Sequence, residues 1–165
     1  MIRIIVVDDH PIIRKGIIQI LEDLPGENYI EDVSNSNELF QKLRELSFNL
    51  IILDISMPGR SGIDLLPDLI QLYPEIPVLI LSMYPEEQYA IRAIKSGAAG
   101  YLTKESAPNE LLMAVKKVIS GGKYITSSLG EKWLKTYLLR MIGPCISSCP
   151  TENTLCSVKL LKVKA

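Results

Sequence analysis

The sequence predicts an α/β fold: a (βα)5 doubly wound parallel sheet of five strands, with one more helix after it. Apolar runs that favour strands alternate with amphipathic segments that favour helices from residue 2 to about residue 120. Four of the runs are continuously apolar, which is typical of strands that helices cover on both faces. We expect the five strands at residues 2–7, 29–33, 50–54, 78–82 and 99–103.

The segment after the first strand predicts an amphipathic helix, because its apolar residues recur at helical spacing. Pro11 stands in the first turn, where proline is tolerated, and Pro25 and Gly26 mark the exit. The next run (YIEDV, 29–33) alternates between apolar and polar residues, which favours an edge strand. The apolar face of the helix comprises Ile13, Ile17, Ile20, Leu21 and Leu24.

A similar helix is predicted after the last strand. Pro108 stands near its start, and Gly121 and Gly122 mark its exit, as Gly97 marks that of the helix before it. Its apolar face comprises Leu111, Ala114, Val115, Val118 and Ile119.

The pattern divides the chain into a folded domain at 1–122, a linker helix at 123–142 and a poorly structured tail at 143–165. Tyr124 and Ile125 could extend the core briefly. Beyond residue 143 helical periodicity stops. The linker helix is predicted from a stripe at spacing four, formed by Leu129, Trp133, Tyr137 and Met141.

Charge is unevenly placed along the chain. Residues 1–122 hold 11 Lys and Arg against 17 Asp and Glu, whereas residues 123–165 hold 7 against 2. The basic segment is interpreted as a solvated tail, with a contact to nucleic acid or an acidic partner as the alternative. No stretch approaches the ~20 apolar residues of a membrane span, and no signal-peptide pattern is seen, so we expect a cytoplasmic protein. Cys145, Cys149 and Cys156 match no zinc pattern and are interpreted as free thiols.

Polar residues end four of the predicted strands. Asp8 and Asp9 follow the first, Asp54 ends the third, Ser82 ends the fourth and Lys104 follows the fifth. Ligands of such sheets bind beyond the carboxyl ends of the strands, where these residues would meet. Because carboxylates repel one another, the cluster requires a divalent cation or a lysine. Mg²⁺ suits oxygen ligands, and a carboxylate beside it can become an aspartyl phosphate.

The motifs VVDDHP, LDISMPGRSG, LILSM and GYLTK occur in this order and resemble the response-regulator receiver domain of two-component signalling. The DDHP start, the MPGRSG loop and the stretch AAGYLTKE resemble the NarL/FixJ (LuxR-type) branch of this family in particular. The resemblance covers residues 1 to about 122 and implies a flavodoxin-like fold with strand order 2-1-3-4-5. Many receivers carry proline after the lysine, often with a cis bond; here Glu105 follows Lys104, which disfavours a cis peptide.

The resemblance also implies roles for the strand-end residues. Asp54 would accept a phosphoryl group from a sensor histidine kinase. Asp9, Asp54 and the backbone carbonyl of Ser56 would hold Mg²⁺, with Asp8 acting directly or through water. Lys104 would pair first with the acids and then with the phosphoryl group. Ser82 and Tyr101 would form the switch pair, although Tyr101 could also be plain core.

The expected protein is therefore a signalling switch that catalyses only its own phosphorylation and dephosphorylation, and not otherwise an enzyme. By resemblance it would regulate transcription as a homodimer. Three apolar residues lie off the buried stripes of their helices: Ile12, Ile18 and Met113. They are interpreted either as scattered surface residues or as part of a dimer face on the first or the last of the five helices.

Relatives of this branch continue into a helix-turn-helix output domain, and none is visible in the 24 residues after Met141. DNA binding by this chain is therefore not expected. The change of composition near Gly143 suggests a shifted reading frame, which translating the other two frames of the gene would test.

Several alternatives compete with this interpretation. A receiver without output could act as a phosphate sink or a protein-interaction module. A phosphatase of the haloacid-dehalogenase type also forms an aspartyl phosphate, but it requires D-x-D in the first loop. A flavodoxin-like cofactor site is disfavoured, since Asp8 and Asp9 would repel a phosphate. His10 is expected to begin the first helix rather than to bind metal.

Overall fold

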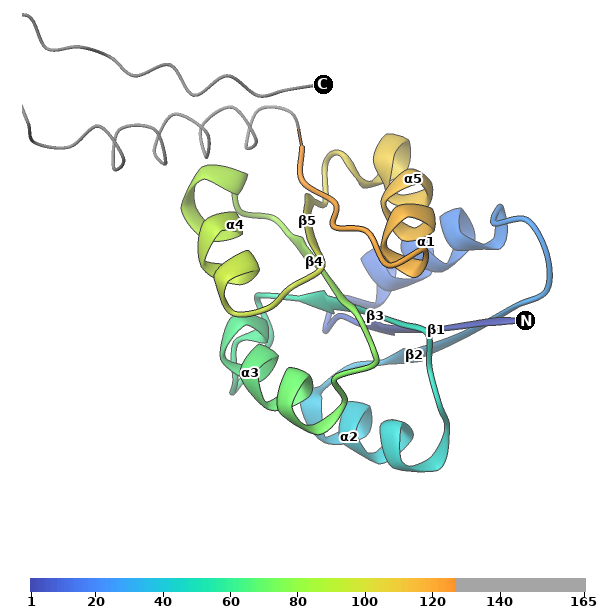
Figure 1. Ribbon diagram of the computed structural model, residues 1–165, viewed down its shortest axis with the longest axis horizontal. Helices are drawn as coiled ribbons and strands as arrows, with labels where there is room; N and C mark the ends of the chain where they lie inside the picture. Colours follow the sequence, from blue (N-terminus) through green and yellow to red (C-terminus); the bar gives the residue numbers. More distant parts are fainter. Residues whose placement is uncertain (127–165) are drawn as a thin grey trace, which may run out of the picture. The chain divides into compact units, whose positions relative to one another are not determined.

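The computed structural model describes residues 1–126 as a parallel sheet flanked by helices (Figure 1). Each strand is followed by a helix, so that five βα units succeed one another along the chain. The strands are β1 (Ile2–Val7), β2 (Asn28–Val33), β3 (Leu50–Asp54), β4 (Val78–Ser82) and β5 (Gly100–Thr103). The helices are α1 (Pro11–Glu22), α2 (Ser36–Glu45), α3 (Gly62–Leu72), α4 (Glu86–Lys95) and α5 (Ala107–Ile119).

The strands lie in the order β2-β1-β3-β4-β5, and every pair is parallel. The predicted (βα)5 fold and its strand order are thereby confirmed, and β2 is the edge strand that its alternating sequence indicated. Three strands have the predicted bounds. β2 begins one residue earlier than predicted and β5 one residue later, at Gly100. Shifts of one residue at strand ends are ordinary, because terminal pairing is the weakest.

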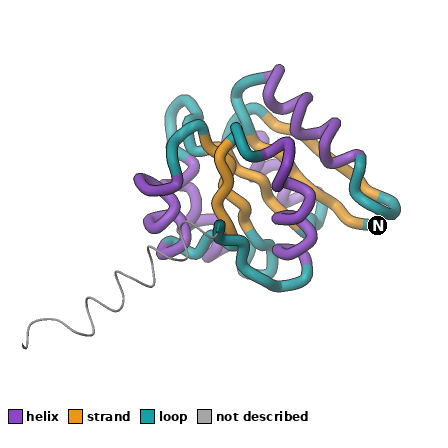
Figure 2. The backbone as a smooth tube through the Cα atoms, turned by 90° about the horizontal axis from the view of Figure 1, so that it is seen from above, coloured by secondary structure: helices purple, strands orange, loops and turns teal. Residues whose placement is uncertain are grey.

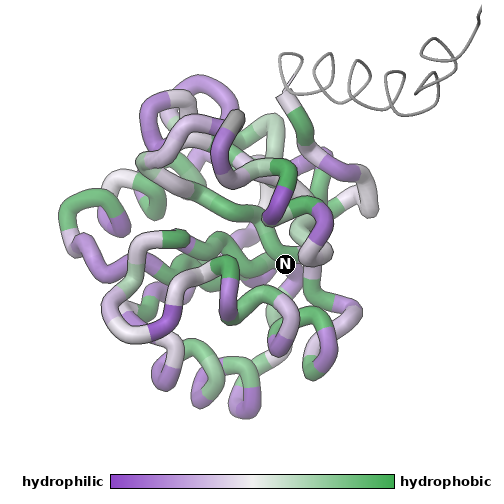
Figure 3. The backbone as a smooth tube through the Cα atoms, turned by 90° about the vertical axis from the view of Figure 1, so that its left-hand side faces the viewer, coloured by the Kyte–Doolittle hydropathy of each residue, from purple (hydrophilic) through white to green (hydrophobic). Residues whose placement is uncertain are grey.

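Helices cover both faces of the sheet (Figure 2), with α1 and α5 on one face and α2, α3 and α4 on the other (Figure 1). This explains the apolar runs, because alternate residues of a strand point to opposite faces and both faces are buried. Every residue of β3 and β4 is buried. In Figure 3 the colour of the helices changes between hydrophobic and hydrophilic within each turn, as expected for helices with one buried face.

The predicted stripe of α1 packs on the sheet as expected. Ile17 and Leu21 are buried together with Leu24, and Ile13 and Ile20 are partly buried against the same core. The stripe of α5 behaves in the same way, with Leu111, Ala114, Val115 and Val118 buried and Ile119 packed against them. Hydrophobic burial on both faces thus holds the strand ends in a defined register.

Local signals begin and end the helices. The Asn35 side chain accepts a hydrogen bond from the Glu38 amide at the start of α2, and Ser61 does the same for Ile63 at the start of α3. Gly97 and Gly121 have positive φ angles of 103° and 86° directly after the C-cap residues of α4 and α5, and Gly26 has a φ of 98° in the turn that follows α1. Glycine adopts this conformation without the cost that a Cβ imposes.

The chain after α5 returns to the sheet. Tyr124 forms a parallel bridge with Gly100, its amide donates to the Ala99 carbonyl at 2.8 Å, and its ring is buried. The expectation that this segment extends the core is therefore confirmed. The rest of the predicted linker helix, the tail with its cysteines and the reading-frame hypothesis concern residues outside those that the structure describes.

Within residues 1–126, no helix has the length and apolarity that crossing a bilayer requires. No cis peptide occurs within the same range, in agreement with the expectation for Lys104 and Glu105.

Candidate functional site

The carboxyl ends of the strands bring the predicted site residues to one edge of the sheet. β3 ends at Asp54 and β4 at Ser82, and the two strands are neighbours. Lys104 follows β5, and its amide donates to the Ser82 carbonyl at 2.7 Å. Asp8 directly follows β1, and its amide donates to the Val33 carbonyl of β2 at 3.2 Å. Backbone hydrogen bonds therefore fix Lys104 beside the end of β4 and Asp8 beside the end of β2.

Lys104 is the cation of the site. Its Nζ lies 2.7 Å from Asp8 Oδ2 and 2.9 Å from Asp54 Oδ2. The side chains are almost fully buried, with 6% of Lys104 and 1% of each aspartate exposed. Because buried charges are costly unless paired, the ammonium compensates the two carboxylates.

The pKa values of Asp54 and Lys104 are both shifted by burial and by the charges around them. Burial raises the pKa of Asp54 above its ordinary value of 3.8, and the Asp8 charge adds to the effect; Lys104 opposes it without cancelling it. Burial opposes the charge of Lys104, but hydrogen bonds to Asp8 and Asp54 outweigh it and leave the Lys104 pKa raised. The lysine is thus held as a cation beside a carboxylate that lacks full compensation.

Asp8 is held by three separate contacts. Oδ1 accepts a hydrogen bond from the His10 amide at 2.8 Å, and Oδ2 faces Lys104. Its backbone carbonyl accepts a hydrogen bond from the Arg14 guanidinium at 2.6 Å. These contacts hold both carboxylate oxygens and the backbone carbonyl of Asp8 in place.

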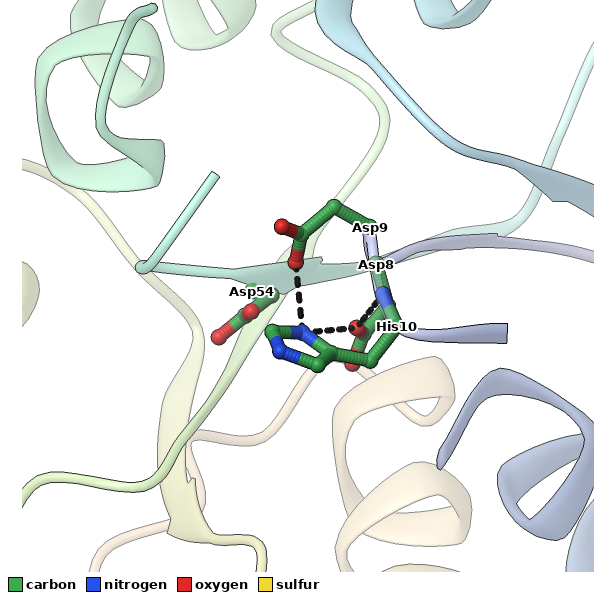
Figure 4. Close-up of side chains that lie close together, drawn as sticks. All are labelled: Asp8, Asp9, His10 and Asp54. Carbon is green, nitrogen blue, oxygen red and sulfur yellow. Dashed lines mark hydrogen bonds and ion pairs between the residues drawn. The ribbon is translucent and has the colours of Figure 1, made fainter. Parts of the chain in front are cut away.

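Asp9 and His10 lie on the outer side of the cluster (Figure 4). His10 Nδ1 lies 2.7 Å from Asp9 Oδ1 and 3.5 Å from Asp8 Oδ1. The side chains of Asp9 and His10 are 26% and 58% exposed, so this side of the site is open to water.

The cluster has the composition and spacing of a cation site. Asp8, Asp9, His10 and Asp54 each offer one ligand atom, and these atoms lie within 4.8 Å of one another. Asp54 Oδ1 is buried, and no group among the described residues reaches it with hydrogen-bond geometry. An unsatisfied buried oxygen beside other carboxylates fits a hard cation such as Mg²⁺.

The predicted switch residues are both buried, and both contact Tyr84. Ser82 Oγ accepts a hydrogen bond from the Tyr84 amide at 3.0 Å. The Tyr101 hydroxyl donates to the Tyr84 carbonyl at 2.9 Å, and only 1% of Tyr101 is exposed. Burial raises the pKa of Tyr101, so the hydroxyl keeps its proton. Tyr101 thus combines a core position with a polar contact to the loop after β4.

Ser56 lies at the mouth of the site. With Asp9, Tyr84 and Tyr89 it lines a hollow of about 530 Å³. The rings of Tyr84 and Tyr89 contact each other at 4.8 Å between centroids, tilted by 37°. Asp9 is the residue of the acidic cluster that lines this hollow.

Three features of the site escaped the sequence interpretation. Tyr84 contacts both switch residues through its backbone, which no side-chain pattern reports. The imidazole of His10 turns toward Asp9, although His10 does begin α1 as its N-cap. Gly62 lies against the Asp54 carbonyl so closely that a Cβ would come within 2.1 Å of it; its place in the MPGRSG loop was the available signal.

Comparison with known proteins gives a consistent result. The family model of the response regulator receiver domain matches residues 4–116. The response regulator GacA of Pseudomonas protegens is 34% identical over 132 residues, which are 80% of this chain and 62% of GacA. The chain therefore spans about three fifths of the length of this curated relative.

Two solved structures extend the comparison. A LuxR-family two-component response regulator from Aurantimonas superposes with a TM-score of 0.75 at 29% identity, over 82% of this chain and 97% of the other. A structure of two RcsB dimers bound to two parallel DNAs superposes with a TM-score of 0.73 at 26% identity, over 86% of this chain and 76% of the other.

Proposed function

Because this chain belongs to the response regulator receiver domain family, we propose that it accepts a phosphoryl group on Asp54 from a phosphohistidine of a sensor histidine kinase. The observation that carries the proposal is the buried pairing of Asp54 with Lys104 beside Asp8. A carboxylate with one buried oxygen left unsatisfied, next to a fixed ammonium, suits attack on phosphorus.

In the proposed step, an oxygen of Asp54 forms the bond to phosphorus while the bond between phosphorus and the kinase imidazole nitrogen breaks. The imidazole keeps the electron pair of that bond. Charge gathers on the equatorial phosphoryl oxygens in such a transfer, so neutralisation and positioning supply most of the rate. Lys104 is already within hydrogen-bond reach of the acceptor and contributes one positive charge.

Asp9, Asp54 and the backbone carbonyl of Ser56 would hold Mg²⁺, with Asp8 supporting them directly or through water. The bound ion would supply further charge neutralisation on the phosphoryl oxygens. Asp8 would orient the other groups, because its two carboxylate oxygens already face the His10 amide and Lys104.

We further propose that Ser82 and Tyr101 read the phosphorylated state. A phosphoryl group on Asp54 would draw the Ser82 hydroxyl away from the Tyr84 amide. The loop after β4 would then shift together with Tyr101, which is bonded to the same residue. A local change of charge would thereby alter the surface formed by α4, β5 and α5.

The remaining parts of the proposal concern partners. The phosphoryl donor is a sensor histidine kinase, and the site of action is the cytoplasm, where such kinases hold their phosphohistidine. We propose a homodimer and a role in transcription, supported by the likeness to RcsB in its DNA-bound dimers. Apart from its own phosphorylation and dephosphorylation, no enzymatic activity is proposed.

The test is phosphorylation with a small donor. The full chain is incubated with Mg²⁺ and acetyl phosphate, and intact mass and oligomeric state are measured. The wild type is expected to gain one phosphoryl group and to change its association. Asp54→Ala should gain none, whereas Asp23→Ala, at an exposed aspartate at the end of α1, should behave as the wild type.

Absence of an adduct on the wild type would reject the proposal. An adduct without any change in association would favour the alternative of a phosphate sink.

A further inference from the structure

His10 is the one histidine of the sequence, and its side chain lies beside the proposed Mg²⁺ site (Figure 4). We infer that the His10 imidazole is an additional metal ligand, through which this site takes a first-row transition cation more tightly than Mg²⁺. The inference rests on the proposed function, since it uses the same carboxylates of Asp9 and Asp54.

Two possible ligand atoms of the site lie close together. His10 Nδ1 lies 2.7 Å from Asp9 Oδ1, yet this buried oxygen has no hydrogen-bond partner among the described residues. The two atoms are therefore close without the alignment of a hydrogen bond. Neighbouring ligand atoms of an octahedral cation, each about 2.1 Å from the ion, lie roughly 3 Å apart. The observed separation is close to that value.

The contacts of the acidic cluster leave a small set of atoms available to an ion. Both carboxylate oxygens of Asp8 face protein donors, namely the His10 amide and Lys104. Asp8 Oδ2, Asp9 Oδ1 and both Asp54 carboxylate oxygens are buried without a hydrogen bond among the described residues. Asp8 Oδ2 and Asp54 Oδ2 face the Lys104 ammonium, which leaves Asp9 Oδ1 and Asp54 Oδ1 without a contact to that cation. Together with His10 Nδ1 they form a donor set of two oxygens and one nitrogen within the cluster.

A donor set of two oxygens and one nitrogen favours particular cations. Mg²⁺ prefers oxygen ligands and retains several waters, so an imidazole adds little to its binding. Imidazole suits Co²⁺, Ni²⁺, Cu²⁺ and Zn²⁺, whose affinities for mixed nitrogen and oxygen sites exceed those of Mn²⁺ and Fe²⁺. A site with His10 as ligand therefore discriminates between two classes of divalent cation.

The backbone at this position supports a ligand without strain. The His10 amide is bonded to Asp8, and α1 begins at the next residue, Pro11. The imidazole is 58% exposed, so its ring can turn toward an ion without displacing core residues. Changing the side chain alone should leave the amide contact to Asp8 in place.

The experiment uses Co²⁺ as the probe, because a paramagnetic ion shifts the proton resonances of an imidazole bound to it. The full chain, with its thiols reduced, is titrated separately with CoCl₂ and MgCl₂ by calorimetry. His10→Gln, which keeps the backbone and a polar side chain, is the matched variant. Both proteins carry the same cysteines, so a difference between them reports the imidazole.

We expect the wild type to bind Co²⁺ more tightly than Mg²⁺. His10→Gln should lose at least about tenfold in Co²⁺ affinity, a loss already found when groups that merely support a ligand are removed. Its Mg²⁺ affinity should be unchanged. The wild type with Co²⁺ should show a shifted, solvent-exchangeable imidazole N–H resonance, which must belong to His10 and should be absent from the variant.

Equal Co²⁺ affinity of the two proteins, with Mg²⁺ still bound by both, would overturn the inference and leave the proposed function standing. Failure of the wild type to bind either ion would instead remove the metal from the proposed function, and the inference with it.

Discussion

Lys104 Nζ lies 2.9 Å from Asp54 Oδ2, although the strands that lead to these residues are separated in the sheet by β4. The long lysine side chain crosses the end of β4, where Ser82 is buried. The Ser82 carbonyl accepts a hydrogen bond from the Lys104 amide at the same place. Three consecutive strand ends are therefore connected at one point. Their dependence on one another can be tested by single substitutions.

Removing the ammonium should destabilise the protein. Lys104→Met leaves the buried carboxylates of Asp8 and Asp54 without their counter-ion, and breaking a buried pair from one side typically costs about 3–5 kcal/mol. Urea denaturation at neutral pH measures the change. Lys95→Met, at an exposed lysine in the last turn of α4, should stay within about 0.5 kcal/mol of the wild type. Equal stability of the two variants would contradict a structural role for the pair.

The raised pKa of Asp54 predicts a pH dependence with a definite sign. Between its unfolded value, near 3.8, and its raised folded value, the folded state binds more protons than the unfolded state, so stability falls as pH rises through this window. Asp54→Asn cannot ionise at this position. The variant should therefore be more stable than the wild type at neutral pH, and its advantage should fade as pH falls toward 3.8.

Thermal or urea unfolding of both proteins across this pH range provides the measurement. Asp23→Asn, at an exposed aspartate, serves as the control and should follow the wild type at each pH. An Asp54→Asn advantage that grows toward acid pH would contradict the assigned direction of the shift.

Tyr101 should stabilise the folded protein through both its ring and its hydroxyl. Tyr101→Phe removes the hydrogen bond to the Tyr84 carbonyl, which should cost about 1 kcal/mol and loosen the loop after β4. Tyr101→Ala also leaves a cavity in the core and should cost about 3–5 kcal/mol. Hydrogen exchange of the Tyr84 amide, compared with denaturant unfolding, separates the two effects. Unchanged exchange in Tyr101→Phe would show that the hydroxyl does not hold the loop.

Replacing either of two helical glycines by alanine should change the stability of the protein in opposite directions. In Gly62→Ala the new Cβ would meet the Asp54 carbonyl oxygen at 2.1 Å, so the backbone at Asp54 must shift. This variant should lose stability by more than about 1 kcal/mol, the lower range for overpacking, and should accept phosphoryl groups more slowly. Gly16→Ala, with open space at the same atom in α1, should gain about 0.4–1 kcal/mol. Unfolding curves and the acetyl phosphate assay measure both.

Sequence reasoning succeeded where a local pattern has one physical meaning. The continuous apolar runs predicted buried parallel strands, and the alternation at 29–33 predicted the edge position of β2. The stripes of α1 and α5 were predicted because helical periodicity selects one face. The (βα)5 order also predicted that Asp8, Asp54 and Lys104 meet, since parallel strands end at one edge.

Prediction from the sequence was weaker where a side chain can point in either of two directions. The sequence left Tyr101 between core and switch, whereas the structure shows a buried ring with its hydroxyl on Tyr84. His10 was expected only to begin a helix, and it does so, but its imidazole also lies against Asp9. Rotamers depend on neighbours that are distant along the chain, which periodicity does not report.

The sequence alone determined the order of the elements, the faces they bury and the set of charged groups at the strand ends, because these follow from periodicity and from chain direction. Tertiary structure decided which atoms of that set are paired and which are left for a cation. It committed both oxygens of Asp8 to Lys104 and the His10 amide, and left Asp54 Oδ1 buried without a hydrogen bond. The reason is that pairing depends on strand order and on side-chain reach across β4, which no segment of the sequence encodes by itself.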